Sequence, residues 1–161
     1  MELKAFQEIH QETMLDILTD PQVRLTYMLP DFSSREAAIP LFQRLMQLSQ
    51  DSSRYVRGIF QDGELVGFLN DVEVQGTSIE LGYVISPKHW NRGYATAALK
   101  LAIAEQFSRG FREVITGAFQ ENPASLRVME KAGMTLLEKQ DIIAYRGRDH
   151  ICIYYSMQVT I

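Results

Sequence analysis

The pattern of hydrophobic and polar positions predicts a chain that mixes strands with helices. Apolar residues recur at helical spacing in the first third of the chain, and they alternate as in strands through much of the rest. The pairs Asp62-Gly63 and Gly76-Thr77 are turn signals between central strands. We expect strands at residues 3–7, 54–61, 65–74, 79–86, 113–119, 134–145 and 151–159. We expect helices at residues 13–18, 34–50, 96–107 and 123–132.

The order of these elements is strand, two helices, three strands, helix, strand, helix and two strands. A mixed sheet with helices on its faces accommodates this order, so the predicted fold class is α/β, in the α+β form. A stretch rich in breakers, with Pro21, Pro30 and Asp31, separates the first two helices. Ser33 or Ser34 is the expected N-cap of the second helix. No repeat or linker is visible, so we expect residues 1–161 to form a single domain.

Composition narrows the class of protein without indicating a reaction. The net charge is −4, which argues against a protein that binds nucleic acid by general attraction. The N-terminus does not resemble a secretory signal, and no apolar run reaches the length of a membrane span. The lone Cys152 cannot form an internal disulfide, which fits a reducing compartment. We therefore expect a cytoplasmic protein without a membrane partner.

Residues 90–98, Trp-Asn-Arg-Gly-Tyr-Ala-Thr-Ala-Ala, carry the first chemical signal. They join an expected strand to an expected helix, and the first amides of a helix have no partners within it. Gly93 leaves those amides accessible, which favours an anion such as phosphate. A second strand–helix junction begins at Asn122, a candidate cap, and has Ser125 in its first turn. Because only one helix and one strand separate the two junctions, both can face the same edge of the sheet.

Together these segments resemble a known family. Residues 80–99, Glu-Leu-Gly-Tyr-Val-Ile-Ser-Pro-Lys-His-Trp-Asn-Arg-Gly-Tyr-Ala-Thr-Ala-Ala-Leu, resemble the acetyl-CoA signature of the GNAT superfamily of acetyltransferases, and residues 122–133 are similar to its second motif. The combination is most similar to the branch of ribosomal-protein-alanine N-acetyltransferases, where a Trp often heads the loop. The resemblance implies the GNAT fold along nearly the whole chain and acetyl-CoA as the acyl donor.

The resemblance also implies roles for individual residues. The pyrophosphate of coenzyme A is expected at the backbone amides of Asn91, Arg92, Gly93, Tyr94, Ala95 and Thr96. The pantetheine amides are expected to pair with Val84, Ile85 and Ser86, at the splayed end of their strand. Asn122 and Ser125 are expected near the pantetheine arm and the thioester. Two positions depart from the family pattern: Trp90 stands where Gln or Arg is common, and Met129 stands where a Tyr often protonates the thiol.

The chemistry of acetyl transfer adds its own requirements. An amine attacks a thioester only as the free base, so a carboxylate that accepts its proton is useful. Glu80, on the strand that leads into the loop, is the candidate base. Ser125, or a water that it holds, is the candidate proton donor to the leaving thiol, with Tyr83 and Tyr94 as weaker options. The structural alternatives are that Glu80 is an exposed strand residue or ion-pair partner and that Ser125 is only a first-turn residue.

The acceptor is the least specified part of the prediction. A primary amine is expected as the acceptor, on a protein N-terminus or a small molecule, and residues 24–36 and 145–150 are expected to line the acceptor site. Arg24, Arg35, Arg146 and Arg148 are either contacts for an acidic acceptor group or solvated side chains. The alternatives are a non-catalytic acyl-CoA-binding sensor and a transferase of another acyl group such as succinyl. A homodimer through the closing strands is also possible.

Three further expectations concern single side chains. His10, His89 and His150 are far apart in the sequence and lack the spacing of zinc ligands, so no metal is expected. His89 is expected at the surface. Cys152 alternates with apolar neighbours and is expected to be a buried small hydrophobe.

Overall fold

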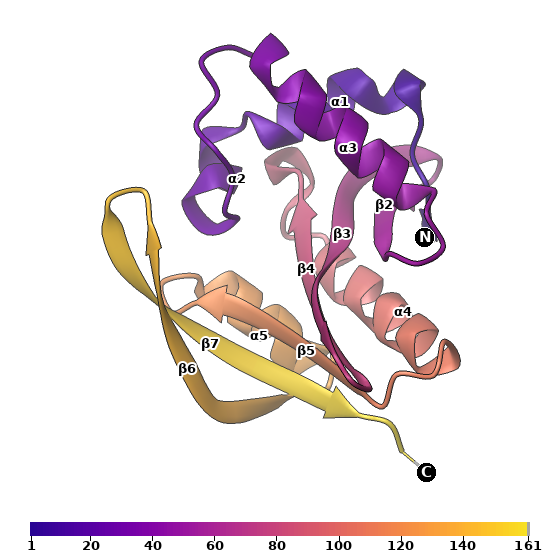
Figure 1. The fold of residues 1–161 in the computed structure, drawn as a ribbon, viewed down its shortest axis with the longest axis vertical. Coiled ribbons are helices and arrows are strands. Elements are labelled where there is room, and N and C mark those ends of the chain that lie inside the picture. The colour runs from indigo at the N-terminus through magenta and orange to yellow at the C-terminus, as the bar shows by residue number, and fades with distance from the viewer. Residues whose placement is uncertain (161) are drawn as a thin grey trace. The chain divides into compact units, whose positions relative to one another are not determined.

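The computed structural model describes residues 1–160 and contains the predicted helices and strands in the predicted order, with one further helix in the first third of the chain (Figure 1). The strands are β1 (Glu2–Lys4), β2 (Val56–Gln61), β3 (Glu64–Gln75), β4 (Ser78–Ile85), β5 (Glu113–Phe119), β6 (Thr135–Tyr145) and β7 (Arg148–Gln158). The α-helices are α1 (Gln11–Leu18), α2 (Pro21–Thr26), α3 (Ile39–Ser49), α4 (Tyr94–Ser108) and α5 (Pro123–Lys131). Short 3-10 turns are η1 (Glu8–His10), η2 (Glu36–Ala38) and η3 (Pro87–His89).

The strands form a seven-stranded sheet in the order β1-β2-β3-β4-β5-β7-β6. The β1–β2, β2–β3, β5–β7 and β6–β7 pairs are antiparallel, and β4–β5 is parallel. The parallel pair is possible because α4 provides the crossover connection that parallel neighbours require. The predicted mixed α/β architecture is therefore confirmed.

The contacts along the chain divide it into two compact units. Unit 1 comprises Met1–Asn70 and Tyr83–Tyr94, and unit 2 comprises Asp71–Gly82 and the chain from Ala95 onward. In unit 1 the helices α1 and α3 pack on each other, and α3 packs on β2. Their core contains fully buried aromatic side chains, including Phe6 and Phe42, whose rings stack with centroids 6.1 Å apart. That residues 1–161 form a single domain stays a prediction.

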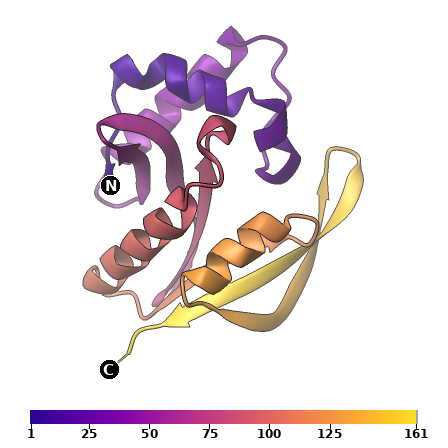
Figure 2. The same cartoon turned by 180° about the vertical axis from the view of Figure 1, so that it is seen from behind.

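In unit 2 the helices α4 and α5 lie on one face of the strands. Figure 1 shows α5 behind β5 and β7, and Figure 2 shows it in front of them. The helix α4 buries Ala98, Leu99 and Ala102. Tyr155 of β7 points to the same side, because its hydroxyl donates to Glu130 Oε1 of α5 at 2.7 Å. The other face of these strands therefore carries the neighbours of Tyr155, Tyr154 included.

The first third of the chain differs most from the prediction. The stretch interpreted as breakers contains α2, which begins at Pro21 with Asp20 as its N-cap; the Asp20 carboxylate accepts the Gln22 amide at 2.8 Å. Pro at the first position of a helix loses no hydrogen bond, so Pro21 starts this helix rather than preventing it. The predicted N-cap at Ser33 or Ser34 is wrong, because α3 begins only at Ile39, after η2. Ser34 instead accepts the Ala37 amide at 3.2 Å.

Other element boundaries shift by a few residues. The first strand ends at Lys4, whereas residues 3–7 were expected. The last hairpin is longer than expected, since β7 begins at Arg148 and pairs with Tyr145 across Arg146 and Gly147. Both turn residues have a positive φ, 52° and 79°, which closes a two-residue hairpin. Among residues 1–160, no helix has the length and apolar composition needed to cross a membrane.

Candidate cofactor and catalytic site

The loop between β4 and α4 has the backbone geometry of an anion site. Asn91 and Gly93 have φ values of 63° and 76°, in the left-handed region, and α4 begins directly afterwards at Tyr94. Such turns aim successive N–H groups toward one side, and the first amides of α4 add to them. Asn91, Arg92 and Gly93 are exposed. A Cβ at Gly93 would meet nothing within 4 Å, so the space beside this residue is open.

Trp90 fixes the start of this loop. Its indole Nε1 donates a hydrogen bond to the Ile85 carbonyl at 2.8 Å, while 44% of the residue remains exposed. Trp90 therefore ties the start of the loop to the end of β4. One lone pair of the Ile85 carbonyl is already used by this bond, and the second remains.

The end of β4 packs tightly on β3. The Ser86 amide donates to the Val66 carbonyl at 2.8 Å. Gly67 faces the same segment, and a Cβ built on it would lie 2.1 Å from the Val84 carbonyl oxygen. Val84, Ile85 and Ser86 are all buried. The absence of a side chain at Gly67 therefore sets the position of these three residues.

His89 was expected at the surface, and this expectation is wrong. The residue is only 7% exposed. Its Nε2 lies 3.3 Å from Glu64 Oε1 at the start of β3, and its ring centroid lies 6.2 Å from that of Tyr94. His89, in the turn η3, is therefore buried beside Tyr94, the first residue of α4.

Glu80 lies on the face of unit 2 opposite α5. It pairs with Ile115 of β5, which shares a face with Gly117 and, through the β5–β7 register, with Tyr154. Glu80 is half-buried. Burial raises the pKa of its carboxyl group, and the nearby Lys139 opposes that shift. A carboxylate with a raised pKa is a stronger base than an exposed one, as the predicted role requires.

Polar side chains from β6 and β7 surround this part of the face. The Tyr154 hydroxyl donates to Asp141 Oδ2 at 2.9 Å, and Lys139 Nζ lies 3.9 Å from the same oxygen. Tyr154 lies over Gly117, where a Cβ would approach its ring to 2.7 Å. Burial raises the pKa of the Tyr154 hydroxyl, and it also raises the pKa of the Cys152 thiol. Cys152 is buried, as predicted.

The second motif forms the N-terminus of α5. Asn122 is its N-cap, and the side-chain oxygen accepts the Ser125 amide at 3.3 Å. The predicted capping role of Asn122 is confirmed. Met129 is fully buried on the same helix, and its thioether has no proton to donate. Contacts of Asn122 and Ser125 with a ligand remain predictions.

A second polar pair beside this motif escaped the sequence reasoning. His150 of β7 is buried, and its Nδ1 bonds to Glu121 Oε1, on the residue that precedes Asn122. The hydrogen bond from His150 is the main cause that lowers the pKa of Glu121. The two residues are 29 positions apart, so only the β5–β7 pairing brings them together. Among residues 1–160, no group of His, Cys, Asp and Glu could hold a metal ion.

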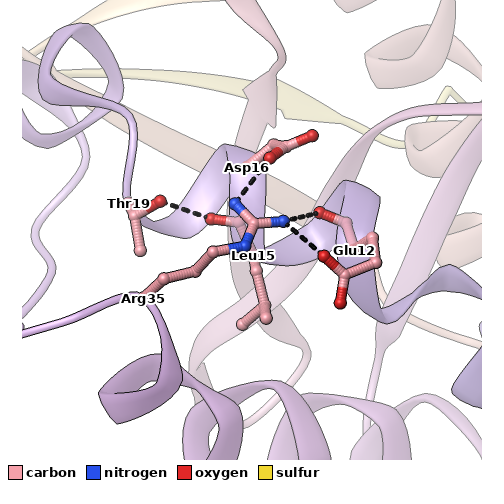
Figure 3. A network of polar contacts seen from close by, with 5 residues as sticks. All are labelled: Glu12, Leu15, Asp16, Thr19 and Arg35. Carbon is pink, nitrogen blue, oxygen red and sulfur yellow. Dashed lines mark hydrogen bonds and ion pairs between the residues drawn. The ribbon is translucent and has the colours of Figure 1, made fainter.

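The arginines proposed as acceptor contacts are engaged within the protein. Figure 3 shows the Arg35 guanidinium between two acidic residues of α1, with Nη1 2.6 Å from Asp16 Oδ1 and Nη2 2.8 Å from Glu12 Oε2. Arg24 Nη1 lies 3.3 Å from Asp31, and Arg148 Nη2 lies 3.8 Å from Glu121. These arginines hold local structure, so their presence does not indicate an acidic acceptor.

The structure groups the predicted site residues in three sets. Val84, Ile85 and Ser86 are continuous with the loop that carries Asn91, Arg92, Gly93, Tyr94, Ala95 and Thr96. Asn122 and Ser125 share the cap of α5. Glu80 lies on the face that carries Tyr154.

Comparison with known proteins decides the family. The sequence model described as "Acetyltransferase (GNAT) domain" matches residues 1–135. The chain belongs to the GNAT acetyltransferases. A curated relative, the uncharacterized N-acetyltransferase YoaA of Bacillus subtilis, is 26% identical over 81% of this chain and 77% of its own length.

Solved GNAT structures share the fold. RimL, a ribosomal L7/L12 alpha-N-protein acetyltransferase in complex with coenzyme A, superposes with a TM-score of 0.84 at 20% identity, over 98% of this chain and 93% of RimL. The spermidine N-acetyltransferase of Vibrio cholerae, in complex with CoA and spermine, gives 0.80 at 15% identity, over 98% and 94%. The predicted GNAT fold is confirmed, and members of the ribosomal-protein branch are among its structural neighbours.

Proposed function

We propose that this GNAT chain is an N-acetyltransferase that moves the acetyl group of acetyl-CoA to a primary amine by direct attack in a ternary complex. The observation that carries the proposal is the loop with Asn91 and Gly93 in the left-handed region, placed directly before α4. In a GNAT chain this geometry suits the pyrophosphate of coenzyme A.

Three groups of residues bind different parts of acetyl-CoA. The amides of Asn91 to Thr96 hold the pyrophosphate, and Val84 to Ser86 pair with the pantetheine arm as an additional strand would. Asn122 and Ser125 contact the arm near the thioester. When bound, acetyl-CoA supplies the acetyl group as an activated thioester.

Glu80 acts as the base of the transfer, directly or through a water. It accepts a proton from the amine, which then forms the new C–N bond as the C–S bond breaks. Ser125, or a water that it holds, gives a proton to the departing sulfur. Because an unperturbed thiol has a pKa of about 8.5, this donor assists the reaction without being indispensable.

The acceptor is a primary amine, on a protein N-terminus or a small molecule. Both kinds of amine are named among the structural neighbours: a ribosomal protein for RimL and spermidine for the Vibrio cholerae enzyme. At 20% and 15% identity, these neighbours share the fold and do not select the acceptor.

Gly93→Glu tests the cofactor loop. The new carboxylate repels the pyrophosphate and strains a residue whose φ is 76°. We expect isothermal titration calorimetry with acetyl-CoA to show no binding. Gly76→Glu is the matched control, because Gly76 also has a positive φ and open space around it but lies in the β3–β4 turn. Binding by Gly93→Glu equal to that of the control would refute the role of the loop.

Release of free thiol from acetyl-CoA tests catalysis. The assay uses peptides with varied N-termini, polyamines, amino acids and aminoglycosides as acceptors. Release that depends on one class of amine supports the transferase and identifies its substrate. Tight binding without release for any amine would indicate a sensor, and competition between acetyl-CoA and succinyl-CoA separates the two acyl groups.

A further inference from the structure

Trp90 is held by both its side chain and its backbone at the end of β4. Its indole Nε1 donates to the Ile85 carbonyl at 2.8 Å, and its backbone amide donates to the Pro87 carbonyl at 3.1 Å. The His89 amide closes the same turn on the Ser86 carbonyl at 2.8 Å. All of these residues belong to unit 1. The ring is therefore fixed relative to the end of the strand.

The indole is a large apolar group that solvent still reaches. Trp90 is 44% exposed although its N–H is bonded, whereas Val84 and Ile85 at the end of β4 are 8% and 7% exposed. The three residues after Trp90 are exposed and carry no apolar side chain. A ligand that covers the indole therefore gains the free energy of removing apolar surface from water.

The position of Trp90 indicates which part of acetyl-CoA lies beside the ring. In the proposed function, Val84 to Ser86 pair with the pantetheine amides, and the amides from Asn91 onward hold the pyrophosphate. Trp90 is bonded to Ile85 in the first group and directly precedes Asn91 in the second. In coenzyme A these two regions are joined by the pantoyl unit, which carries two methyl groups on one carbon. These methyl groups are the apolar part of the connecting segment.

We propose that the exposed indole of Trp90 packs on the two pantoyl methyl groups of acetyl-CoA and selects for this branched arm of the cofactor. The inference deepens the proposed function and rests on it. The contact is apolar, because the single N–H of the indole is already bonded to Ile85. Trp90 thereby has two separable roles: the N–H ties the loop to β4, and the ring contacts the ligand.

Two substitutions separate the ring from its hydrogen bond. Trp90→Phe keeps an aromatic face and loses the N–H, whereas Trp90→Gln loses the ring and keeps a side-chain N–H that can donate. Wild type and both variants are titrated by calorimetry with acetyl-CoA and with an analogue in which hydrogen replaces both pantoyl methyl groups. Circular dichroism shows which variants are folded.

The preference between the two ligands is the quantity that tests the contact. We expect wild type to bind acetyl-CoA about fivefold to tenfold more tightly than the analogue, because the methyl groups leave water against the ring. Trp90→Phe binds both ligands more weakly by a similar factor and keeps this preference. Trp90→Gln loses the preference, so its two affinities agree within about twofold. If folded Trp90→Gln prefers acetyl-CoA as strongly as wild type does, the proposal is overturned.

A donor without the nucleotide distinguishes the pantoyl contact from stacking of the adenine on the indole. Acetyl-phosphopantetheine contains the pantoyl unit and lacks the adenosine. We expect Trp90→Gln to weaken the binding of this donor and of acetyl-CoA by the same factor. A loss confined to acetyl-CoA would place the adenine on the ring and overturn the proposal.

The results for wild type separate this inference from the proposed function and do not depend on whether a variant folds. If wild type binds no acetyl-CoA, the proposed function is wrong, and the pantoyl contact is wrong with it. If wild type binds acetyl-CoA and the analogue without methyl groups equally well, only the pantoyl contact is wrong.

Discussion

The close approach of Gly67 to β4 allows a sharp test of how the fold positions the proposed cofactor site. A Cβ at Gly67 would lie 2.1 Å from the Val84 carbonyl oxygen and 3.0 Å from Ile85 Cα. Real Cβ atoms essentially never approach closer than 3.0 Å. In Gly67→Ala the end of β4 must therefore move by about the difference between 3.0 and 2.1 Å, close to 1 Å. Backbone atoms are involved on both strands, so no side-chain rotation relieves the overlap.

The size of the effect follows from that displacement. Overpacking of this kind costs about 1–3 kcal/mol of folding free energy. The displaced residues are those expected to pair with the pantetheine arm, and a misplacement of about 1 Å costs on the order of 100-fold in function. We therefore expect Gly67→Ala to lose about 100-fold in acetyl-CoA affinity, the equivalent of about 2.7 kcal/mol, together with about 1–3 kcal/mol of stability, as measured by calorimetry and urea denaturation.

Gly76→Ala is the control for stability. Its φ of 59° strains any residue with a Cβ, but nothing lies within 4 Å of the added atom. We expect a cost of about 1–2 kcal/mol and unchanged acetyl-CoA affinity. If Gly67→Ala binds acetyl-CoA as well as Gly76→Ala does, the position of Val84 and Ile85 does not determine affinity, and the reasoning is refuted.

Three further substitutions test single side chains. Glu80→Gln removes the base and is expected to lower kcat by about 10²–10⁴-fold. Burial raises the pKa of Glu80, so the folded protein holds the carboxyl proton more tightly than the unfolded chain does, and it loses stability as the pH rises from the ordinary pKa of 4.5 to the raised pKa. Above that pH window we expect the neutral Glu80→Gln variant to melt at a higher temperature than wild type. A lower melting temperature together with a normal kcat would contradict both expectations. Trp90→Phe keeps a ring but loses the bond to Ile85; a loss of about 1 kcal/mol raises the KM for acetyl-CoA about fivefold with kcat unchanged, and an unchanged KM would remove Trp90 from loop positioning. Among the described residues, the buried Thr116 hydroxyl has no hydrogen-bond partner, so Thr116→Val is expected to raise the melting temperature by about 2–4 °C. A lower melting temperature of the variant, measured by scanning calorimetry, would show that the hydroxyl does have a partner.

The elements that the sequence predicted correctly are those with strong local signals. Asp62-Gly63 forms the β2–β3 turn with both φ values positive, 52° and 80°, because these residue types tolerate that conformation. Asn122 caps α5 through the Ser125 amide, and Gly93 adopts the left-handed conformation before α4. In each case the residue type and its neighbours along the chain determine the geometry.

The missed features depend on residues that are distant in the sequence or on a signal that was misread. The Asp20-Pro21 start of α2 was visible, but proline was interpreted only as a breaker. His89 lies beside Glu64, which is distant in the sequence, and the His150–Glu121 pair depends on the β5–β7 register. The partners of Arg35 lie on α1, about 20 residues earlier in the chain. No periodicity within one segment predicts such contacts.

The position of Trp90 gives the protein an intrinsic fluorescent reporter of the loop proposed to bind the cofactor. It is the only tryptophan in the chain, it directly precedes the loop, and its indole donates one hydrogen bond while 44% of the residue is exposed. Its fluorescence therefore arises from one known environment, without overlap from a second indole. A ligand that covers the loop removes water from that ring and shifts its emission. Occupancy of the loop can thus be followed in unlabelled protein in real time, including the rates at which a ligand arrives and departs.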